Sequence, residues 1–439
     1  MSPADAGAVV WSAAPTAAWR RRAGRGLWAV LDQGFFALSN LTLGVLLARW
    51  LTAREYGAFA LAFSVFLLFG TVYSALVPEP MLVFGTSRYA AAFGAYLRRL
   101  LAGHALVTGV GSAAFAAAGG AFQWCGAPVM AHAFLSWAAA APCVTLSWLL
   151  RRACFARGRP DLAAGAGAAQ LGMTVGLLSL LAARGTLTLF TAVATSAAVN
   201  VATSGWLLVR LRRGIAPPGG TPEGDARGVL RLHWEYGRWA AAGGILSWVA
   251  SYSYYVVLPY WAGLEASAAL RALYTLGIPV AHAQTALATL LIPALVRARG
   301  GSGFGRLVRQ CLVAFGAASV AGWLVLGVTG PRLVHLAYRG RYDAYGPLLW
   351  TVAAVPITAG AGDVLRSALR AQERPDRVFW GYVVAAATTA TLGMALTYCF
   401  HVLGPALGEI ASGAAAVAVM AFALARRGPA PATPRTPTP

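Results

Sequence analysis

The side chains most able to do chemistry in this chain lie inside long apolar stretches. Asp32 is a carboxylate within the apolar run 27–48. A charged side chain costs roughly 2.5–3.5 kcal/mol near the centre of a membrane-spanning helix, so such a group is a functional candidate by default. At about 100° per residue, Gln33, Ser39 and Asn40 share an arc of about 120° with Asp32. This polar stripe predicts either a seam against neighbouring helices or the wall of a water-filled cavity.

A second carboxylate, Glu79, stands between Pro78 and Pro80 at the end of the apolar run 56–78. The prolines leave carbonyls of the preceding turn unpaired, which suits a cavity wall or a hinge. A helix terminus at the membrane interface is the simpler alternative. If the first two runs cross in opposite directions, Glu79 and Asp32 approach the same side of the membrane and are able to lie close together.

Further charged groups follow later in the chain. Arg271 and His282 share a polar stripe of one apolar run, where they could attract a phosphate or sugar hydroxyls. Alternatively, Arg271 is an interfacial anchor and His282 a core histidine. Arg88 is predicted, with Arg271, at the mouth of a cavity. Asp363 precedes Arg366 by three residues, a spacing that favours an internal ion pair. The predicted substrate- or ion-binding residues are Asp32, Asn40, Glu79, Arg88, Arg271, His282 and Asp363.

The elements that must position these groups follow from composition. The chain has 439 residues, of which 58% are hydrophobic and 11% charged. Soluble domains carry about 25% charged residues, so this composition predicts a polytopic membrane protein. The net charge of +21 would suggest nucleic acid as a partner of a soluble protein. Here the arginines lie between apolar runs, so membrane topology explains them and no nucleic-acid partner is expected.

Twelve apolar runs match the thickness of a bilayer at a helical rise of about 1.5 Å per residue. They cover about residues 27–48, 56–78, 100–122, 129–150, 161–183, 186–209, 239–261, 267–295, 307–330, 346–369, 378–400 and 404–425. With the N-terminus inside, 28 of the 35 basic residues fall on the cytoplasmic side and the other seven outside. The positive-inside rule therefore predicts a multi-pass protein of the cytoplasmic membrane with both termini cytoplasmic.

A polar connection near the middle of the chain holds Pro217, Pro218 and mixed charges, which is typical of a linker. It divides the twelve runs into six and six. The predicted organisation is a basic cytoplasmic N-terminus (1–26), an N-terminal six-helix bundle (27–213), a cytoplasmic linker (214–235), a C-terminal six-helix bundle (236–427) and a disordered tail (428–439).

Enzyme signatures are missing from the sequence. It contains no P-loop, HExxH or GxSxG pattern, and its five cysteines form no CxxC pair. This argues against an ATP-driven pump, a hydrolase and a structural metal site. We therefore expect neither an enzyme nor a cofactor, with H⁺ or Na⁺ coupling left open.

The N-terminal stretch resembles the opening of bacterial polysaccharide flippases of the multidrug/oligosaccharidyl-lipid/polysaccharide exporter (MOP) superfamily. The segments that carry the resemblance are Asp32-Gln33, Ser39-Asn40, Leu46-Leu47-Ala48-Arg49-Trp50-Leu51 and Glu55-Tyr56-Gly57-Ala58-Phe59-Ala60. Pro78-Glu79-Pro80, Arg151-Arg152-Ala153-Cys154 and Tyr236-Gly237-Arg238-Trp239 are similar to patterns in the actinobacterial branch.

The resemblance implies an all-α, MATE-like fold with two six-helix bundles around a central cavity that opens alternately to each side. It also implies a polyprenyl-linked glycan as cargo, membrane lipids as surroundings, and polysaccharide polymerase and glycosyltransferases as partners. Many members have fourteen helices, whereas twelve are predicted here, which puts one means of holding the lipid tail in doubt. A cation-coupled small-molecule exporter of the same fold is the alternative function.

Overall fold

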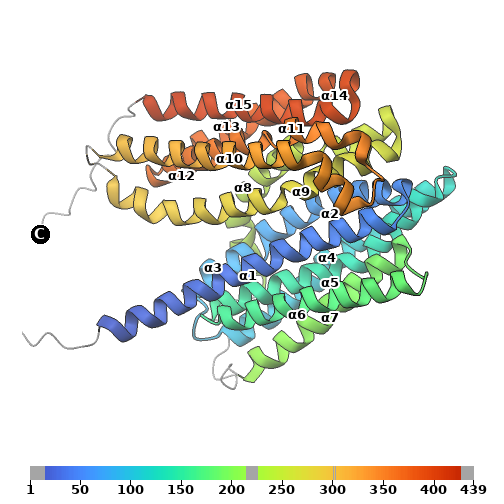
Figure 1. Cartoon of the computed structure of the whole chain (residues 1–439). Helices are drawn as coiled ribbons and strands as arrows, with labels where there is room; N and C mark the ends of the chain where they lie inside the picture. The colour runs from blue at the N-terminus through green and yellow to red at the C-terminus, as the bar shows by residue number, and fades with distance from the viewer. Residues whose placement is uncertain (1–14, 214–225, 300, 302, 427–439) are drawn as a thin grey trace, which may run out of the picture.

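The computed structural model describes residues 15–213, 226–299, 301 and 303–426 (Figure 1). Nearly all of these residues are helical. Most of the predicted N-terminal segment, residues 214–225 of the predicted linker and the predicted tail lie outside the described residues. Residues 226–235, predicted as linker, form the first turns of a helix.

The N-terminal bundle contains seven helices. They are α1 (Pro15–Trp50), α2 (Ala53–Leu76), α3 (Pro78–Phe84), α4 (Phe93–Trp124), α5 (Pro128–Ala156), α6 (Pro160–Ala183) and α7 (Leu189–Arg213). Helix α5 packs against α4, α7 and α2, and α1 packs against α6. The short α3 exists because Pro78 and Pro80 lack the N–H groups that would continue the α2 ladder.

The C-terminal bundle holds the remaining elements. They are α8 (Ala226–Tyr252), α9 (Tyr254–Ala298), α10 (Phe304–Tyr338), η1 (Asp343–Leu348), α11 (Leu349–Val352), α12 (Val355–Ala371), α13 (Pro375–Thr388), η2 (Thr389–Gly393), α14 (Met394–Phe400), η3 (His401–Leu403) and α15 (Gly404–Ala425). Helix α15 packs against α12 and α13, and α12 packs against α9 and α10.

Ten helical stretches in the described part of the chain are long and apolar enough to cross a membrane. Two of them, Gly228–Thr285 and Pro375–Ala425, have 58 and 51 residues, far more than the roughly 20 that one crossing needs. Each is broken by a residue with positive φ, Gly263 (81°) and His401 (48°). Counted as two crossings each, these stretches give the twelve crossings that the sequence predicts.

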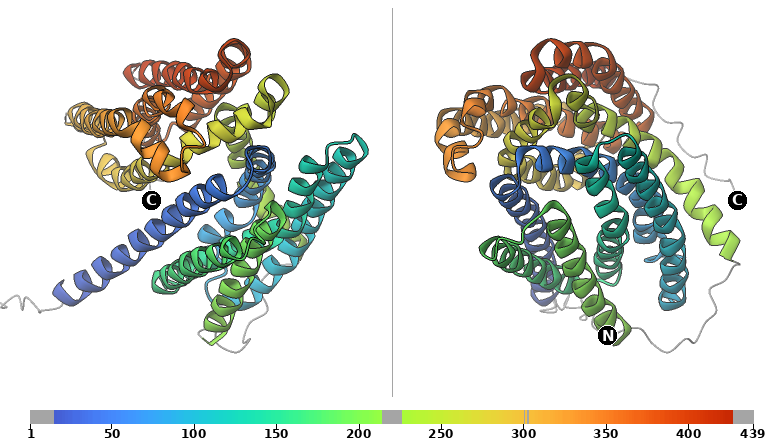
Figure 2. Two further views of the ribbon diagram at one scale, coloured as in Figure 1. Left: turned by 45° about the vertical axis from the view of Figure 1, so that its right-hand side comes forward. Right: turned by 90° about the vertical axis from the view of Figure 1, so that its right-hand side faces the viewer.

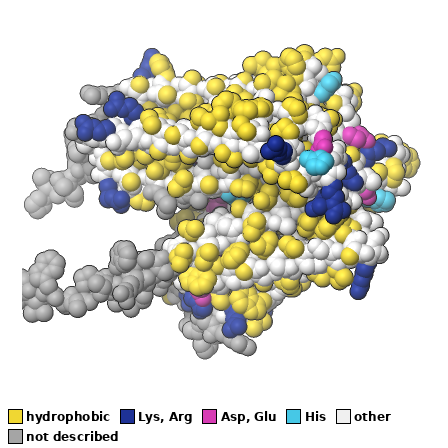
Figure 3. Space-filling model, viewed as in Figure 1, with side chains coloured by type: hydrophobic (Ala, Val, Ile, Leu, Met, Phe, Trp, Pro, Cys, Tyr) yellow, Lys and Arg dark blue, Asp and Glu magenta, His cyan; other side chains and the backbone are white. Residues whose placement is uncertain are grey.

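The two bundles lie side by side as separate lobes (Figures 1 and 2). We call the end where α1 begins and α15 ends the inner end, since the arginine pattern predicts it to be cytoplasmic. The opposite end is the outer end. Figure 3 shows the two lobes separated by a hollow at the inner end and joined towards the outer end.

Core packing explains why only the outer end is closed. One apolar cluster contains side chains of both bundles, including Leu51 and Tyr56 from the first and Tyr255 and Tyr338 from the second. Towards the inner end, one buried cluster belongs to the first bundle apart from Val229 of α8, and two smaller clusters belong to the second bundle. Apolar burial stabilises roughly in proportion to area, so the shared cluster holds the lobes together at the outer end.

Polar contacts reinforce this outer seal. The guanidinium of Arg341, from the loop after α10, donates to the carbonyl of Leu51 at the end of α1. A Cβ atom on Gly57 would meet the carbonyl of Leu264 in the turn between the seventh and eighth crossings. The two bundles therefore touch through backbone atoms at this point.

Helix α8 belongs to the second bundle but lies along α2 of the first. The indole of Trp248 donates to the carbonyl of Ser64 over 2.7 Å. Nearer the inner end, Nδ1 of His233 donates to the carbonyl of Leu76 over 2.8 Å, and the hydroxyl of Tyr96 donates to its Nε2 over 2.7 Å. Because a carbonyl only accepts, this pattern fixes the neutral tautomer of His233. Helix α8 is thus the main contact between the lobes towards the inner end.

Candidate functional site

Three adjoining cavities lie between and within the bundles towards the inner end. The largest, which we call the vestibule, has a volume of about 850 Å³ and lies between α3 and helices α8, α12 and α13. Its charged lining residues are Glu79, Arg370 and Asp376. Trp239, Phe379, Trp380 and Tyr382 supply aromatic surface. This mixture of aromatic faces and charges suits a ligand with both sugar-like and ionic groups.

The N-bundle pocket, about 230 Å³, opens beside the vestibule and shares Glu79 with it. Asp32 of α1 and Arg151 of α5 meet in this pocket, with 2.6 Å between Oδ1 and Nη2. Their side chains are only 2% and 8% exposed. The guanidinium also lies 5.1 Å from the ring centroid of Phe36. Asp32 is therefore paired with a neighbouring helix and also lines a cavity.

Glu79 occupies the place that the sequence suggested. Asp32 and Glu79 line the same pocket, and Glu79 is exposed to both cavities. The short α3 turns the carboxylate out of the α2 axis and towards the vestibule. Glu79 thus lies on the cavity wall at a helix junction.

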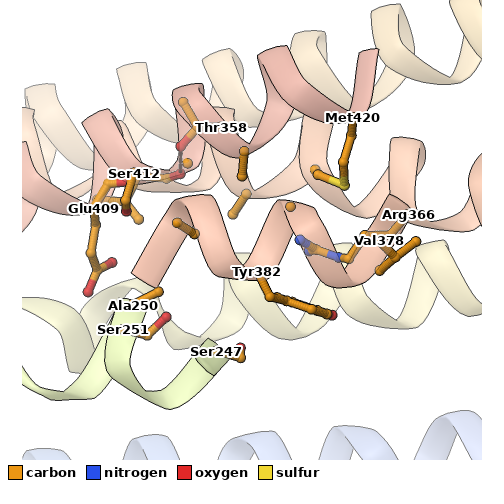
Figure 4. Close-up of a pocket in the computed structure, with 17 residues that line it drawn as sticks. Ser247, Ala250, Ser251, Thr358, Arg366, Val378, Tyr382, Glu409, Ser412 and Met420 are labelled. Atoms are coloured by element: carbon orange, nitrogen blue, oxygen red, sulfur yellow. Dashed lines mark hydrogen bonds between the residues drawn. The ribbon is translucent and has the colours of Figure 1, made fainter. Parts of the chain in front are cut away.

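The C-bundle pocket, about 180 Å³, extends from the vestibule into the second bundle (Figure 4). Helices α8, α12, α13 and α15 form its walls. Arg366 lies towards the vestibule and Glu409 at the far end, as Figure 4 shows. Asp363 forms the predicted ion pair with Arg366, with 2.5 Å between Oδ1 and Nη2.

Arg271 and His282 lie between the bundles. Arg271 packs at the outer seal with its guanidinium carbon 4.7 Å from the centroid of Phe63, and its buried Nε has no hydrogen-bond partner. It lines none of the three cavities. The imidazole of His282 meets Phe36 of α1 edge to face at 6.1 Å. Arg271 therefore does not occupy the cavity mouth in this conformation, because aromatic side chains enclose it.

Arg88 and Asn40 also lie away from the cavities. Arg88 is exposed in the turn between α3 and α4, 5.8 Å from the ring centroid of Tyr89. Asn40 is half-buried on α1 and lines none of the three cavities. The arginines that line the three cavities are instead Arg151 and Arg366, which are paired with carboxylates, and Arg152 and Arg370.

An ion pair outside the membrane-spanning segments joins two helix ends at the inner end of the second bundle. Arg299, just after α9, binds Glu373 in the turn between α12 and α13, with 2.5 Å between Nη1 and Oε1. Hydrogen bonding and the positive charge of Arg299 lower the pKa of the Glu373 carboxyl below its ordinary value. This pair ties the ends of neighbouring helices together without lining the cavities.

Sequence reasoning did not single out two of the groups now found in the cavities. Arg151 appeared only within a motif, although it neutralises Asp32 from 119 positions away in sequence. Glu409 was not among the predicted site residues. It could have been found, since it is the one carboxylate of the apolar run 404–425.

Comparison with known proteins adds to this geometry. No family model and no curated protein matches the chain. Among solved structures, an inward-facing multidrug resistance MATE family transporter of the MOP superfamily aligns with a TM-score of 0.74 and 12% identity. The alignment covers 91% of this chain and 100% of that one. This chain therefore shares the fold of that transporter.

Two further structures refine the comparison. The lipid II flippase MurJ, in an inward closed conformation, aligns with a TM-score of 0.72 and 10% identity over 91% of this chain and 87% of its own. An outward-facing MATE family transporter of the MOP superfamily gives 0.61 and 12% identity over 91% and 94%.

Proposed function

We propose that this protein is a flippase that moves a lipid-linked oligosaccharide or polysaccharide precursor across the cytoplasmic membrane. The sugar head would travel through the space between the bundles while the polyprenyl tail stays in lipid. In this proposal both termini are cytoplasmic, and polymerase and glycosyltransferases supply or consume the substrate. H⁺ or Na⁺ would drive transport.

The observation that carries the proposal is the way α1 leaves α9. Their contact at Phe36 and His282 lies part-way along α1, and the two ribbons diverge from there towards the inner end (Figures 1 and 2). On the diverging part of α1, Leu27 and Val30 are 60% and 61% exposed. Asp32 and Gln33 of the same part of α1 line the N-bundle pocket. Apolar surface for a lipid tail would therefore adjoin a polar cavity for the sugar, as a substrate that is half sugar and half lipid requires.

The charges of the cavities fit an anionic, hydroxylated head group. Arg152 and Arg370 face the N-bundle pocket and the vestibule, where guanidinium groups could bind a pyrophosphate bidentately. Glu79 and Asp376 offer acceptors to sugar hydroxyls, or hold a coupling cation. The paired Asp32 would keep Arg151 oriented beside them.

Alternating access would change which binding groups are exposed, as well as the end at which the cavity is open. Arg271 is now enclosed at the outer seal, and separation of Tyr56 from Tyr255 would uncover it. We infer that Arg271 receives the pyrophosphate in the outward-open state, after the arginines of the inner end release it. This assigns the predicted anion-binding role of Arg271 to the second half of the cycle.

The alternative is a cation-coupled exporter of small molecules, as the likeness to multidrug MATE structures suggests. An exporter of apolar cations is expected to have a drier, more aromatic pocket than the arginine-lined cavities described above. The same strain experiment distinguishes the two functions.

The test is to extract membrane lipids from a strain that lacks the gene and to quantify polyprenyl-linked oligosaccharides by mass spectrometry. We expect accumulation that the wild-type gene reverses and the Asp32→Ala variant does not, at equal abundance in the membrane. An unchanged lipid pool together with new sensitivity to toxic small molecules would instead establish the exporter.

A further inference from the structure

The C-bundle pocket has a composition that pyrophosphate binding does not require. Between Arg366 and Glu409 its walls carry five hydroxyl groups (Figure 4). These belong to Ser247 and Ser251 of α8, Thr358 of α12, Tyr382 of α13 and Ser412 of α15. Hydroxyls that come from four different helices and face one space indicate a ligand site more than helix packing.

Several of these polar groups have no partner in the protein. Within the described part of the chain, the hydroxyls of Ser247, Ser251 and Tyr382 make no hydrogen bond. By contrast, Ser412 donates to the carbonyl of Glu409 over 3.1 Å, and the carboxyl group of Glu409 interacts with the hydroxyl of Tyr274. The three free hydroxyls belong to half-buried side chains that line the cavity, so they are available to a polar ligand.

The chemistry of the pocket narrows the ligand class. Glu409 at the closed end disfavours phosphate or carboxylate groups there, and Asp363 already neutralises Arg366 at the other end. Tyr382, Met420 and the methyl groups of the wall offer an apolar face. Donors and acceptors around one apolar face match a neutral sugar ring, whose hydroxyls both donate and accept while its C–H face packs on apolar side chains.

The volume of the C-bundle pocket also favours a single sugar ring. Pockets for drug-sized ligands have volumes of about 300–1,000 Å³. The C-bundle pocket, at about 180 Å³, lies below this range, so it suits a fragment such as a single sugar ring better than an oligosaccharide. The vestibule next to it shares Ser247 and Tyr382, so further sugar units and the pyrophosphate could extend back to Arg370.

We propose that the C-bundle pocket binds one neutral sugar residue of the transported glycan, held by Glu409, Ser251 and Arg366. The inference rests on the proposed function and deepens it, because it assigns sugar selection to the second bundle and pyrophosphate binding to the cavity mouth. The carboxyl group of Glu409 and the hydroxyl of Ser251 bond the ring hydroxyls at the far end. Arg366 bonds those nearest the vestibule.

The experiment measures binding of free glucose, galactose and N-acetylglucosamine to the purified full-length protein in lipid nanodiscs by isothermal titration calorimetry. We expect at least one sugar to bind. Ser251→Leu, which fills the pocket, and Glu409→Leu should each weaken binding at least tenfold. Glu409→Gln keeps an acceptor oxygen and should weaken it less. Ser179→Leu is the matched control, a half-buried serine on α6 outside the cavities, and should leave binding unchanged.

Three results would overturn the inference. The first is that none of the sugars binds the wild-type protein, and the second is that Ser251→Leu binds sugar as the wild type does. The third is that Glu409→Gln and Glu409→Leu lose the same amount of affinity and that binding is accompanied by proton or Na⁺ exchange. The last would make Glu409 a cation site. These outcomes are separate from the proposed function, which the lipid pool of the deletion strain tests without reference to this pocket.

Discussion

Removal of either partner of the Asp32–Arg151 pair gives the sharpest test of the site. Breaking a buried ion pair by deleting one partner costs about 3–5 kcal/mol, because the other charge stays buried without a counter-charge. In Asp32→Leu the guanidinium keeps its contact with Phe36 and a 3.3 Å hydrogen bond to the backbone carbonyl of residue 32. We therefore expect a loss near the lower limit, about 3 kcal/mol.

The double variant Asp32→Leu/Arg151→Met separates stability from transport. Replacing both charges of a buried pair with apolar groups is often neutral or stabilising by about 1–4 kcal/mol, so the double variant should regain wild-type stability. Unfolding by SDS in mixed micelles, followed by circular dichroism, measures the free energy of unfolding of Asp32→Leu, Arg151→Met and the double variant. Clearance of accumulated lipid-linked glycan in the deletion strain measures transport.

We expect the double variant to be stable and inactive, since the N-bundle pocket loses the ion pair that orients its polar wall. If the double variant transports normally, the pair is only a structural seam and the reasoning about the pocket is refuted. If the single variants are as stable as the wild type, the pair is not buried in the membrane-embedded protein. The conservative variant Asp32→Glu keeps the charge and should retain both stability and transport in part.

Further predictions concern the two ends of the molecule. Gly57→Ala should open the outer seal, because the added Cβ atom would meet the facing carbonyl of Leu264. Gly277→Ala is the control and should leave the seal closed, since open space surrounds Gly277. Distances between spin labels on the two bundles at the outer end measure the change. Arg341→Ala removes the donor to the end of α1 and should lengthen the same distances. The pKa of Glu373 is lowered by its bond to Arg299, so the pair stabilises at neutral pH and this contribution is lost as pH falls. Glu373→Gln should thus lower the melting temperature at about pH 7 but not at about pH 3, and equal losses at both values would contradict this explanation.

Much of the fold was predictable because run length and charge distribution are local properties of the sequence. Apolar runs of bilayer length and an excess of arginine on one side suffice to place twelve crossings. Gly263 and His401, where two long helical stretches break, lie where the predicted runs end or meet. The exposed cavity position of Glu79 also followed from its two flanking prolines.

The site was less predictable because helical spacing gives directions only relative to the same helix. Asp32 showed that α1 needed a polar partner but not which helix supplied it. Arg271 was expected at the cavity mouth, and in this structure its half-buried side chain packs against Phe63 at the outer seal instead. The partner of Asp32 and the depth of Arg271 are both decided by packing between distant segments.

The unequal chemistry of the two ends has a consequence for the energetics of the cycle. The outer end is sealed by an apolar cluster that spans both bundles, whereas the surfaces that would meet at the inner end carry Glu79 and Arg152 on one side and Arg370 and Asp376 on the other. Salt weakens attraction between exposed charges beyond about 8 Å at physiological ionic strength but leaves apolar contacts in place. Rising ionic strength should therefore favour the conformation that is open at the inner end, and the salt concentration on that side of the protein would help to set the lifetime of this conformation.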